Sequence, residues 1–469
     1  MESLREEAKG RNIVKYDVVV IGSGVGGYPA ALYLADKGFK VAVVEEHLVG
    51  GECTNYGCVP SKALYSIAES IKAIEKVGGN ASYKWSDLVE WVKGIVKEAR
   101  EGIAYLFESR GVELISGRGV LKPNKRVVVE SGGDRREIEY SKALLAPGTD
   151  PADIPAARFD GEGIVSNREA LYFPEKPERI LIIGGGVIGV ELANTLAAFK
   201  VEVTVVELLD HILPFLDRDV ALAVKAHLQQ RSVRVLEKTS VTRVEKTSSG
   251  YLAELTSGEK LVVDKVVVAV GRKPKTAGVG LEEVGVEVDA KGFIKVSEHL
   301  ETTAPGVYAA GDVVGGPLLA HKAIVESIAA AKRIAGEESF TVNYKLVPLT
   351  IFTGLEVAVV GYTEKELQAM GVKYTKTRIP LGYLSAVKIK GYKSSFVKVL
   401  HDEAGRVYGI HIVAPSASEV ISAYIPLYLG LLKPENTRRI PYPHLTVSES
   451  LRDLAEYLLG EPVHLVKKQ

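Results

Sequence analysis

Cysteine is scarce in this chain: the 469 residues include two, Cys53 and Cys58, alongside two methionines and two tryptophans. So few thiols exclude the disulfide framework of a small secreted domain. They are also too few for a four-ligand zinc site, because no second Cys or His pair accompanies them. We therefore expect no metal centre. The length instead predicts about three or four globular domains.

The chain also lacks an excess of charge of either sign. Its 59 basic side chains balance 59 acidic ones, and the sequence pI is close to 7.1. Nucleic acids and anionic membranes attract proteins through a basic surface. The balance therefore argues against either as the main partner.

Long apolar runs are missing too. No uninterrupted apolar stretch approaches the length that spans a bilayer. The first residues, Met1–Gly10, are charged and have no apolar core of a secretory signal. We expect a soluble, cytoplasmic protein.

Both cysteines lie in one segment, Gly50–Lys62, which reads Gly-Gly-Glu-Cys-Thr-Asn-Tyr-Gly-Cys-Val-Pro-Ser-Lys. With no other thiol in the chain, they can pair only with each other within one molecule. The glycines and Pro60 predict a turn, and the helical spacing from Ala63 onward predicts a helix. A thiol near a helix N-terminus has a lowered pKa and is more nucleophilic. We hypothesise a redox-active disulfide; a structural disulfide in an oxidising compartment and two inert buried cysteines are the alternatives.

A nucleotide-binding pattern precedes this segment. In order it comprises a strand (Val14–Ile21), a glycine-rich turn (Gly22–Gly27), a helix through Lys37, and a strand (Val41–Val44) that ends at Glu45. Gly22 permits the tight turn, and Gly24 lets a diphosphate approach the backbone. Gly27 lets helix and strand pack closely, and Glu45 would bind ribose hydroxyls. The combination predicts a dinucleotide site.

The pattern then repeats. The second copy comprises the strand Arg179–Ile183, the turn Gly184–Gly189 with glycines at Gly184, Gly186 and Gly189, the helix Val190–Phe199, and the strand Glu202–Val206 ending at Glu207. Eighteen positions separate the last glycine from the acid in both copies. A 2′-phosphate needs a basic partner, whereas Glu207 would repel it, and Leu208–Asp210 offers no arginine. The second site is therefore predicted to bind NAD rather than NADP.

Other segments complete these units. We expect helices at Ala63–Val77, Ser86–Arg110 and from Leu318 to Ala335, and strands at Val112–Val120, Arg126–Glu130, Val266–Val270 and Gly306–Asp312.

With two nucleotide sites, the cysteine pair and the Ala309–Asp312 segment, the chain resembles the FAD-dependent pyridine nucleotide-disulfide oxidoreductases from about Tyr16 to about His464. Ser61–Lys62 and Gly316–Lys322 resemble the branch that oxidises dihydrolipoamide. The resemblance implies an α/β fold with two Rossmann-like dinucleotide-binding domains and a C-terminal α+β dimerisation domain. The implied boundaries are 1–149 (FAD), 150–277 (NAD), 278–344 (a central domain completing the FAD site) and 345–469 (the interface).

The resemblance also assigns the cofactors, FAD at the first site and NAD at the second. It implies that Cys53 is the interchange thiol and that Cys58 contacts the flavin. Lys62 and Glu191 match positions that pair beside the flavin, although an ordinary helix-surface ion pair is the alternative. The implied cofactor-binding residues are Gly22, Gly24, Gly27, Glu45, Gly51, Lys62, Arg118, Gly119, Gly148, Asp312 and Ala320 for FAD, and Gly184, Gly186, Gly189, Glu207, Val241 and Gly271 for NAD.

The C-terminal segment Tyr442–Glu449 resembles the family's histidine–glutamate motif. Imidazole can accept the proton that a substrate thiol must lose, and a carboxylate on its other nitrogen fixes the tautomer. The resemblance assigns these roles to His444 and Glu449, with the histidine supplied by the second subunit of a homodimer. The alternatives are a surface histidine and a capping box, Thr446–Glu449, for the following helix.

Several positions depart from the family's pattern. Glu52 stands where threonine is usual, and a carboxylate there needs solvent or a cation. Tyr442 and Leu445 replace a histidine and a proline, and Thr353–Glu356 lacks the usual proline.

We expect oxidation of dihydrolipoamide, or of a lipoyl group on a carrier protein, with NAD⁺ through FAD and the disulfide. The alternatives are an NADH-dependent reductase of another small disulfide, such as coenzyme A disulfide, and a non-catalytic flavoprotein scaffold or redox sensor. A glutathione-type enzyme would usually carry Lys in place of Ser61, and a mercuric reductase would carry further C-terminal cysteines.

Overall fold

The computed structural model describes residues 13–466 of the chain, so the expectation for Met1–Gly10 lies outside the described residues. The described residues form a mixed α/β fold of two compact units, as the predicted fold class requires. Within the described residues, the first unit draws on 13–60, 90–151 and 272–344, and the second on 61–89, 152–271 and 345–466. The four predicted domain boundaries stay a prediction.

The first unit is built on a seven-stranded sheet with the order β3-β2-β1-β6-β5-β4, in which β17 also pairs with β6. Its strands are β1 (Val14–Ile21), β2 (Val41–Glu45), β3 (Glu113–Ser116), β4 (Arg118–Lys122), β5 (Arg126–Ser131), β6 (Asp134–Leu145) and β17 (Val307–Ala309). Strands β1, β2, β3, β6 and β17 are parallel, which explains the apolar run Val18–Ile21 in β1, since both faces of such a sheet are covered.

The predicted strand Val112–Val120 is wrong in one respect, because it is two strands, β3 and β4. Gly117 lies between them with φ 143°, and a Cβ there would meet Val129 Cγ1 at 2.7 Å. A side chain is therefore excluded at this break. The chain turns here from parallel pairing with β2 to antiparallel pairing with β5.

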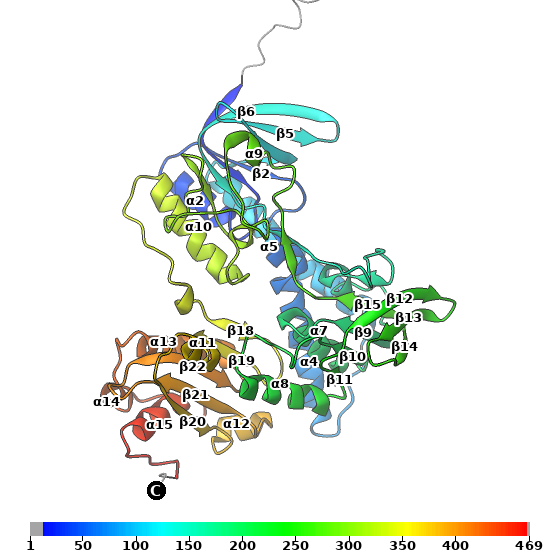
Figure 1. The fold of residues 1–469 in the computed structure, drawn as a ribbon, viewed down its shortest axis with the longest axis vertical. Coiled ribbons are helices and arrows are strands. Elements are labelled where there is room, and N and C mark those ends of the chain that lie inside the picture. The colour runs from blue at the N-terminus through cyan, green and yellow to red at the C-terminus, as the bar shows by residue number, and fades with distance from the viewer. Residues whose placement is uncertain (1–12, 467–469) are drawn as a thin grey trace, which may run out of the picture. The chain divides into compact units, whose positions relative to one another are not determined.

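Helices α2 and α10 pack against each other in the first unit (Figure 1). Small residues, including Ala30 and Ala330, lie fully buried between them, and Ser327 Oγ accepts a hydrogen bond from the Ala30 amide at 2.9 Å. The unit contains α2 (Tyr28–Asp36), α3 (Gly51–Tyr56), α9 (Leu281–Val284), η1 (Asp312–Val314), α10 (Ala320–Ile334) and the antiparallel pair β7 (Thr149–Pro151) and β16 (Arg272–Pro274); α4 (Cys58–Glu75) and α5 (Trp85–Ser109) contribute to both units.

The second unit contains a five-stranded parallel sheet with the order β11-β10-β9-β15-β8. It comprises β8 (Ile164–Val165), β9 (Arg179–Ile183), β10 (Glu202–Val206), β11 (Arg234–Leu236) and β15 (Lys265–Val268), with the antiparallel strands β12 (Val241–Thr247), β13 (Gly250–Leu255) and β14 (Lys260–Val263) and the helices α6 (Asn167–Ala170), α7 (Val187–Ala198) and α8 (Arg218–Gln230). Helix α7 was expected from Val190 and begins at Val187.

The same unit holds an antiparallel sheet with the order β18-β19-β22-β21-β20, and α13 packs on it (Figure 1). Its elements are η2 (Tyr344–Leu346), β18 (Leu349–Ile351), β19 (Val357–Gly361), β20 (Thr375–Pro380), β21 (Phe396–His401), β22 (Val407–Val413), α11 (Glu364–Ala369), α12 (Ser385–Lys390), α13 (Ala417–Tyr428), α14 (Pro434–Thr437) and α15 (Glu449–Leu458). Strands, α13 and α15 share one apolar core, which matches the α+β domain expected at the C-terminus.

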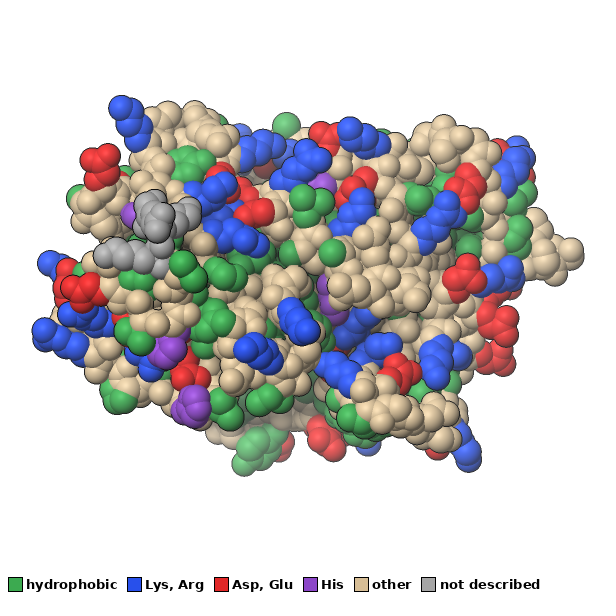
Figure 2. Space-filling view, turned by 90° about the horizontal axis from the view of Figure 1, so that it is seen from below, with side chains coloured by type: hydrophobic (Ala, Val, Ile, Leu, Met, Phe, Trp, Pro, Cys, Tyr) green, Lys and Arg blue, Asp and Glu red, His purple; other side chains and the backbone are tan. Residues whose placement is uncertain are grey.

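Surface charge is mixed rather than segregated on the face drawn in Figure 2, where basic and acidic side chains lie interspersed. Among residues 13–466, no helix combines the length and the apolar character needed to cross a membrane.

Candidate active site

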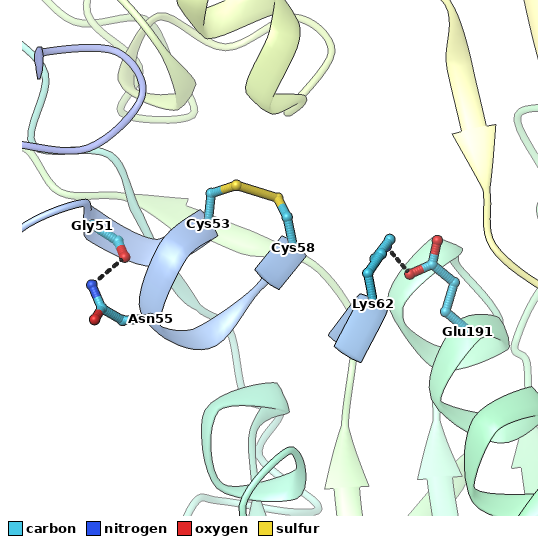
Figure 3. Close-up of a disulfide and its surroundings, with 6 residues drawn as sticks. All are labelled: Gly51, Cys53, Asn55, Cys58, Lys62 and Glu191. Carbon is cyan, nitrogen blue, oxygen red and sulfur yellow. Dashed lines mark hydrogen bonds and ion pairs between the residues drawn. A yellow bond between two sulfur atoms is a disulfide. The ribbon is translucent and has the colours of Figure 1, made fainter. Parts of the chain in front are cut away.

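Cys53 and Cys58 form a disulfide, with 4.7 Å between their Cα atoms (Figure 3). Cys53 lies in α3 and Cys58 begins α4, so the helix expected from Ala63 starts five residues earlier and includes Pro60. Asn55 holds the loop by donating hydrogen bonds from Nδ2 to the Val49 and Gly51 carbonyls, both at 2.9 Å. The two sulfur atoms are bonded to each other, which excludes the alternative of two inert free cysteines.

The first glycine-rich turn has the geometry that a dinucleotide requires. Gly22 has φ 97°, and a Cβ on Gly27 would lie 2.0 Å from the Gly22 carbonyl oxygen. Glu45 Oε2 accepts hydrogen bonds from the amide of Ser23 at 2.8 Å and from its hydroxyl at 2.6 Å. The turn, the start of α2 and the acid at the end of β2 therefore converge, as the motif predicts.

The structure adds a contact that the sequence analysis missed. A Cβ on Gly26 would meet the Ala310 carbonyl oxygen at 2.9 Å and Gly311 Cα at 3.1 Å. This close approach brings the end of β17, and with it Asp312, against the glycine-rich turn. Burial raises the pKa of Asp312, and Thr149 Oγ1 donates to its carboxylate at 3.2 Å.

The other residues assigned to FAD lie around the same turn and strand ends. A Cβ on Gly51 would lie 2.7 Å from Gly24 Cα, so α3 begins against the glycine-rich turn. Gly119 approaches Val44 at the end of β2, and Arg118 pairs with Glu130 at 2.8 Å. Gly148 (φ 77°) precedes Thr149, and Ala320 opens α10. The close backbone approaches and the Glu45 carboxylate beside this turn fit FAD.

The second glycine-rich turn repeats two contacts of the first, the close approach of its first and last glycines and the hydrogen bond from its backbone to the acid. A Cβ on Gly189 would lie 2.0 Å from the Gly184 carbonyl oxygen, and Glu207 accepts the Gly185 amide at 2.8 Å. Gly184 has φ 109°, and a side chain on Gly186 would point into open space. This region therefore fits a second dinucleotide.

Two further residues assigned to NAD lie in the same unit. The Val241 side chain is buried in the core, so a cofactor contact there would use its main chain. Gly271 has φ 134° and follows β15. The structure also places Lys238 3.2 Å from Asp210, a basic group near this site that the local sequence did not reveal.

Lys62 and Glu191 form an ion pair of 2.6 Å, with side chains 33% and 13% exposed (Figure 3). The pair has a third member, Phe352. Its amide donates to Glu191 Oε1 at 2.9 Å, and its ring centre lies 4.4 Å from Lys62 Nζ. A mostly buried carboxylate that holds both a lysine and a backbone amide differs from an ordinary surface pair.

His444 and Glu449 are paired through Nδ1 and Oε1 at 3.0 Å. The histidine side chain is 78% exposed, whereas that of Glu449 is 10% exposed. Glu449 Oε2 accepts the Thr446 amide at 3.2 Å, but the Thr446 hydroxyl bonds Pro443 and Ser448 instead of the amide of Glu449. The two reciprocal hydrogen bonds of a capping box are therefore not both formed, so that alternative is wrong. Helix α15 begins at Glu449 itself.

The departures from the family pattern have distinct environments. Glu52 meets a cation, since Arg272 lies 3.1 Å from its carboxylate. Tyr442 packs against the C-terminal core, and Leu445 is 46% exposed. Glu356 is buried and accepts hydrogen bonds from Ser418.

Comparison with known proteins identifies the family. Residues 16–327 match the model for the pyridine nucleotide-disulphide oxidoreductases, and residues 347–455 match the dimerisation domain of that family. The chain belongs to this family. It therefore uses FAD and NAD(H), as the resemblance implied, and it is an oxidoreductase acting through a disulfide.

Relatives cover almost the whole chain. The dihydrolipoyl dehydrogenase of Thermus scotoductus is 37% identical over 466 residues, covering 97% of this chain and 99% of that protein. That of Trypanosoma brucei brucei is 37% identical over 458 residues, with 93% and 95% covered. Among solved structures, LpdA from Mycobacterium tuberculosis has a TM-score of 0.88 at 28% identity, covering 95% of this chain and 100% of that one. The HOCl-induced flavoprotein disulfide reductase RclA from Escherichia coli has a TM-score of 0.85 at 25% identity, with 94% and 99% covered.

Proposed function

We propose that this protein oxidises dihydrolipoamide with NAD⁺, through FAD and the Cys53–Cys58 disulfide. The observation that carries the proposal is the Cys53–Cys58 disulfide, which joins α3 to α4 while Gly51, the first residue of α3, packs on the first glycine-rich turn. The full-length similarity to proteins named dihydrolipoyl dehydrogenase supports this substrate over other disulfides.

In the proposed reaction, one substrate thiolate attacks the Cys53 sulfur, which breaks the Cys53–Cys58 bond and forms a mixed disulfide. The second substrate thiolate then displaces Cys53, so the substrate leaves as a disulfide and both cysteines are reduced. Bound FAD supplies the two-electron chemistry that returns the cysteines to the disulfide and reduces NAD⁺ to NADH. In total, dihydrolipoamide and NAD⁺ give lipoamide, NADH and one proton.

His444 is proposed to accept the substrate thiol proton at Nε2. Its Nδ1 is paired with Glu449, so the carboxylate fixes the tautomer that leaves Nε2 free to act as the base. Lys62 and Glu191 are proposed to set the charge beside the flavin.

The working form is proposed to be a cytoplasmic homodimer. The match of residues 347–455 to a dimerisation domain supports this assembly. The exposed His444 side chain is consistent with a base that acts on the disulfide of the second copy. A monomer that stays fully active on dilution would contradict the dimer.

A turnover screen tests the substrate. The holoprotein is assayed with NAD⁺ and dihydrolipoamide, and in the opposite direction with NADH and the disulfides lipoamide, glutathione disulfide and coenzyme A disulfide. We expect the highest kcat/KM with the lipoyl substrates. A preference for another disulfide would leave the redox centre intact but overturn the substrate, and turnover of none would favour a scaffold or sensor.

A further inference from the structure

Lys322 and Glu326 form an ion pair inside the first unit, and both side chains are fully buried. They lie one turn apart on α10, with 3.0 Å between Lys322 Nζ and Glu326 Oε2. The attraction within such a pair seldom repays the cost of removing both charges from water. Lys322 also lies in the first turn of α10, where the helix dipole disfavours a cation. The helix alone therefore gives no reason for a lysine at this position, so the groups that its ammonium binds must account for it.

The ammonium holds the loop Gly311–Gly315, which contains η1. Lys322 Nζ donates hydrogen bonds to the carbonyl of Gly311 at 3.0 Å and to the carbonyl of Gly315 at 2.8 Å, one at each end of η1. With Glu326 as the third acceptor, all three hydrogens of the ammonium are used. Glu326 Oε2 also accepts the Gly311 amide at 2.8 Å. Gly311 is therefore held at both its amide and its carbonyl by side chains of α10.

This loop carries Asp312 and lies against the first glycine-rich turn. Gly311 has φ 86°, a conformation that favours glycine, and a Cβ on Gly26 would meet Gly311 Cα at 3.1 Å. Asp312 follows directly in the chain. Burial raises the pKa of Asp312, whereas the positive charges of Arg272 and Lys322 act in the opposite direction. Lys322 therefore acts on Asp312 in two ways, by holding the adjoining backbone and by its charge.

We propose that Lys322 is a positioning residue for FAD retention, and that its ammonium holds the loop Gly311–Gly315 so that Asp312 stays beside the glycine-rich turn. Without the ammonium, the carbonyls at both ends of η1 lose this buried donor, and the loop can move away from Gly26. The inference rests on the proposed function only in that FAD occupies the first nucleotide site and that Asp312 contacts it, as the family resemblance implies. The identity of the dithiol substrate does not enter it.

The test measures the rate at which FAD leaves the purified holoprotein, followed as the rise in flavin fluorescence after dilution. Lys322→Met has no donor and should release FAD at least about tenfold faster, because hydrogen bonds from a charged donor are the strong ones. Glu326→Gln is the shape-matched variant. It should stay within about threefold of wild type, because an amide can reproduce every hydrogen bond of this carboxylate. Its oxygen can accept from Gly311 and Lys322, and its nitrogen can donate to the Tyr344 hydroxyl, which in the wild type donates to Glu326 Oε1 at 2.8 Å.

A double-variant comparison separates positioning of Asp312 from a general loss of structure. Asp312→Asn is prepared alone and together with Lys322→Met. If Lys322 acts through Asp312, adding Lys322→Met to Asp312→Asn should speed release by less than about threefold further, because both changes remove one shared effect. A merely structural role predicts the same acceleration, about tenfold or more, in both backgrounds, and that result would overturn the proposal.

Two other results would also overturn it. One is wild-type retention of FAD in Lys322→Met. The other is release from Glu326→Gln as fast as from Lys322→Met, since the charge of the pair rather than its hold on the loop would then retain FAD. Lys37→Met is the matched control and should behave as wild type, because it removes a lysine from a partly exposed ion pair in the same unit. If Lys322→Met does not fold, Lys322→Gln, whose shorter amide cannot reach all three acceptors, replaces it in the same comparison. Wild-type protein lacking FAD would instead refute the function proposed above.

Discussion

The ammonium of Lys62 lies 4.4 Å from the centre of the Phe352 ring and also forms an ion pair of 2.6 Å with Glu191. A cation over an aromatic ring is stabilised by roughly 0.5 to 2 kcal/mol. Phe352 also donates its amide to Glu191, so it fixes both members of the pair.

Replacing Phe352 by leucine should therefore loosen Lys62 while keeping an apolar side chain. We expect flavin reduction by NADH to slow by about two- to thirtyfold, the equivalent of the lost cation–π contact. Stopped-flow absorbance of the flavin measures this rate. Phe352→Tyr keeps the ring and should behave as wild type, and equal rates in the leucine variant would show that the ring has no influence on the pair.

Glu449→Gln removes the charge that stabilises an imidazolium on His444 but keeps an oxygen for the Thr446 amide. We expect kcat with dihydrolipoamide to fall by about 10²-fold or more, as general-base catalysis contributes about 10²- to 10⁴-fold. NADH oxidation by ferricyanide, which needs no substrate thiol, should be unchanged. A parallel loss of both activities would point to misfolding rather than to the base.

Cys53→Ser should abolish dithiol oxidation, because serine cannot form the mixed disulfide with the substrate. Reduction of the flavin by NADH should persist, since it precedes any thiol chemistry in that direction. Anaerobic titration with NADH and steady-state assays with dihydrolipoamide distinguish the two. Surviving dithiol turnover would remove Cys53 from the interchange role.

Buried His227 predicts an acid-dependent loss of stability. Burial, with smaller effects from Arg231 and Lys76, lowers its pKa to about 3, and its Nε2 donates to Asn194 Oδ1 at 3.1 Å. The unfolded chain takes up this proton near pH 6.5. The contribution of neutral His227 to the free energy of unfolding is thus complete above about pH 6.5. It is lost as the pH falls toward about 3, at up to roughly 1.4 kcal/mol per pH unit.

His227→Gln tests this, because an amide can still donate to Asn194. Thermal unfolding at pH 7 and pH 5 should show a smaller drop in Tm for the variant than for wild type. The same drop in both proteins would mean that other groups account for the acid sensitivity.

The nicotinamide nucleotide should be NAD. Both Glu207 oxygens are held by backbone amides, those of Gly185 and Leu209, so the carboxylate stays at the site and would repel a 2′-phosphate. Lys238 is the nearby cation, but Asp210 pairs with it. We expect kcat/KM for NAD⁺ to exceed that for NADP⁺ at least about tenfold, which corresponds to a repulsion of about 1.4 kcal/mol. Equal values would contradict this reasoning. The variant Lys238→Ala tests whether that lysine contributes.

The sequence by itself determined the features that arise within a short stretch of chain. Gly27 can approach the Gly22 carbonyl because it has no Cβ, which would clash there. The glycines of the motif therefore indicate this tight turn from the sequence alone. Cys53 and Cys58 pair because they lie five residues apart across a turn and no other thiol competes. The repeat of the glycine pattern with the same distance to an acid likewise identified two nucleotide sites.

Only the tertiary structure decided the contacts between residues far apart in the chain. Nothing local to Gly26 indicates that Ala310 will lie against it, and nothing near Glu52 indicates that Arg272 will form an ion pair with it. The placement of Phe352 on Lys62 is of the same kind. Such contacts depend on how sheets and helices pack, and packing is set by the whole apolar core rather than by the spacing of residues within one segment.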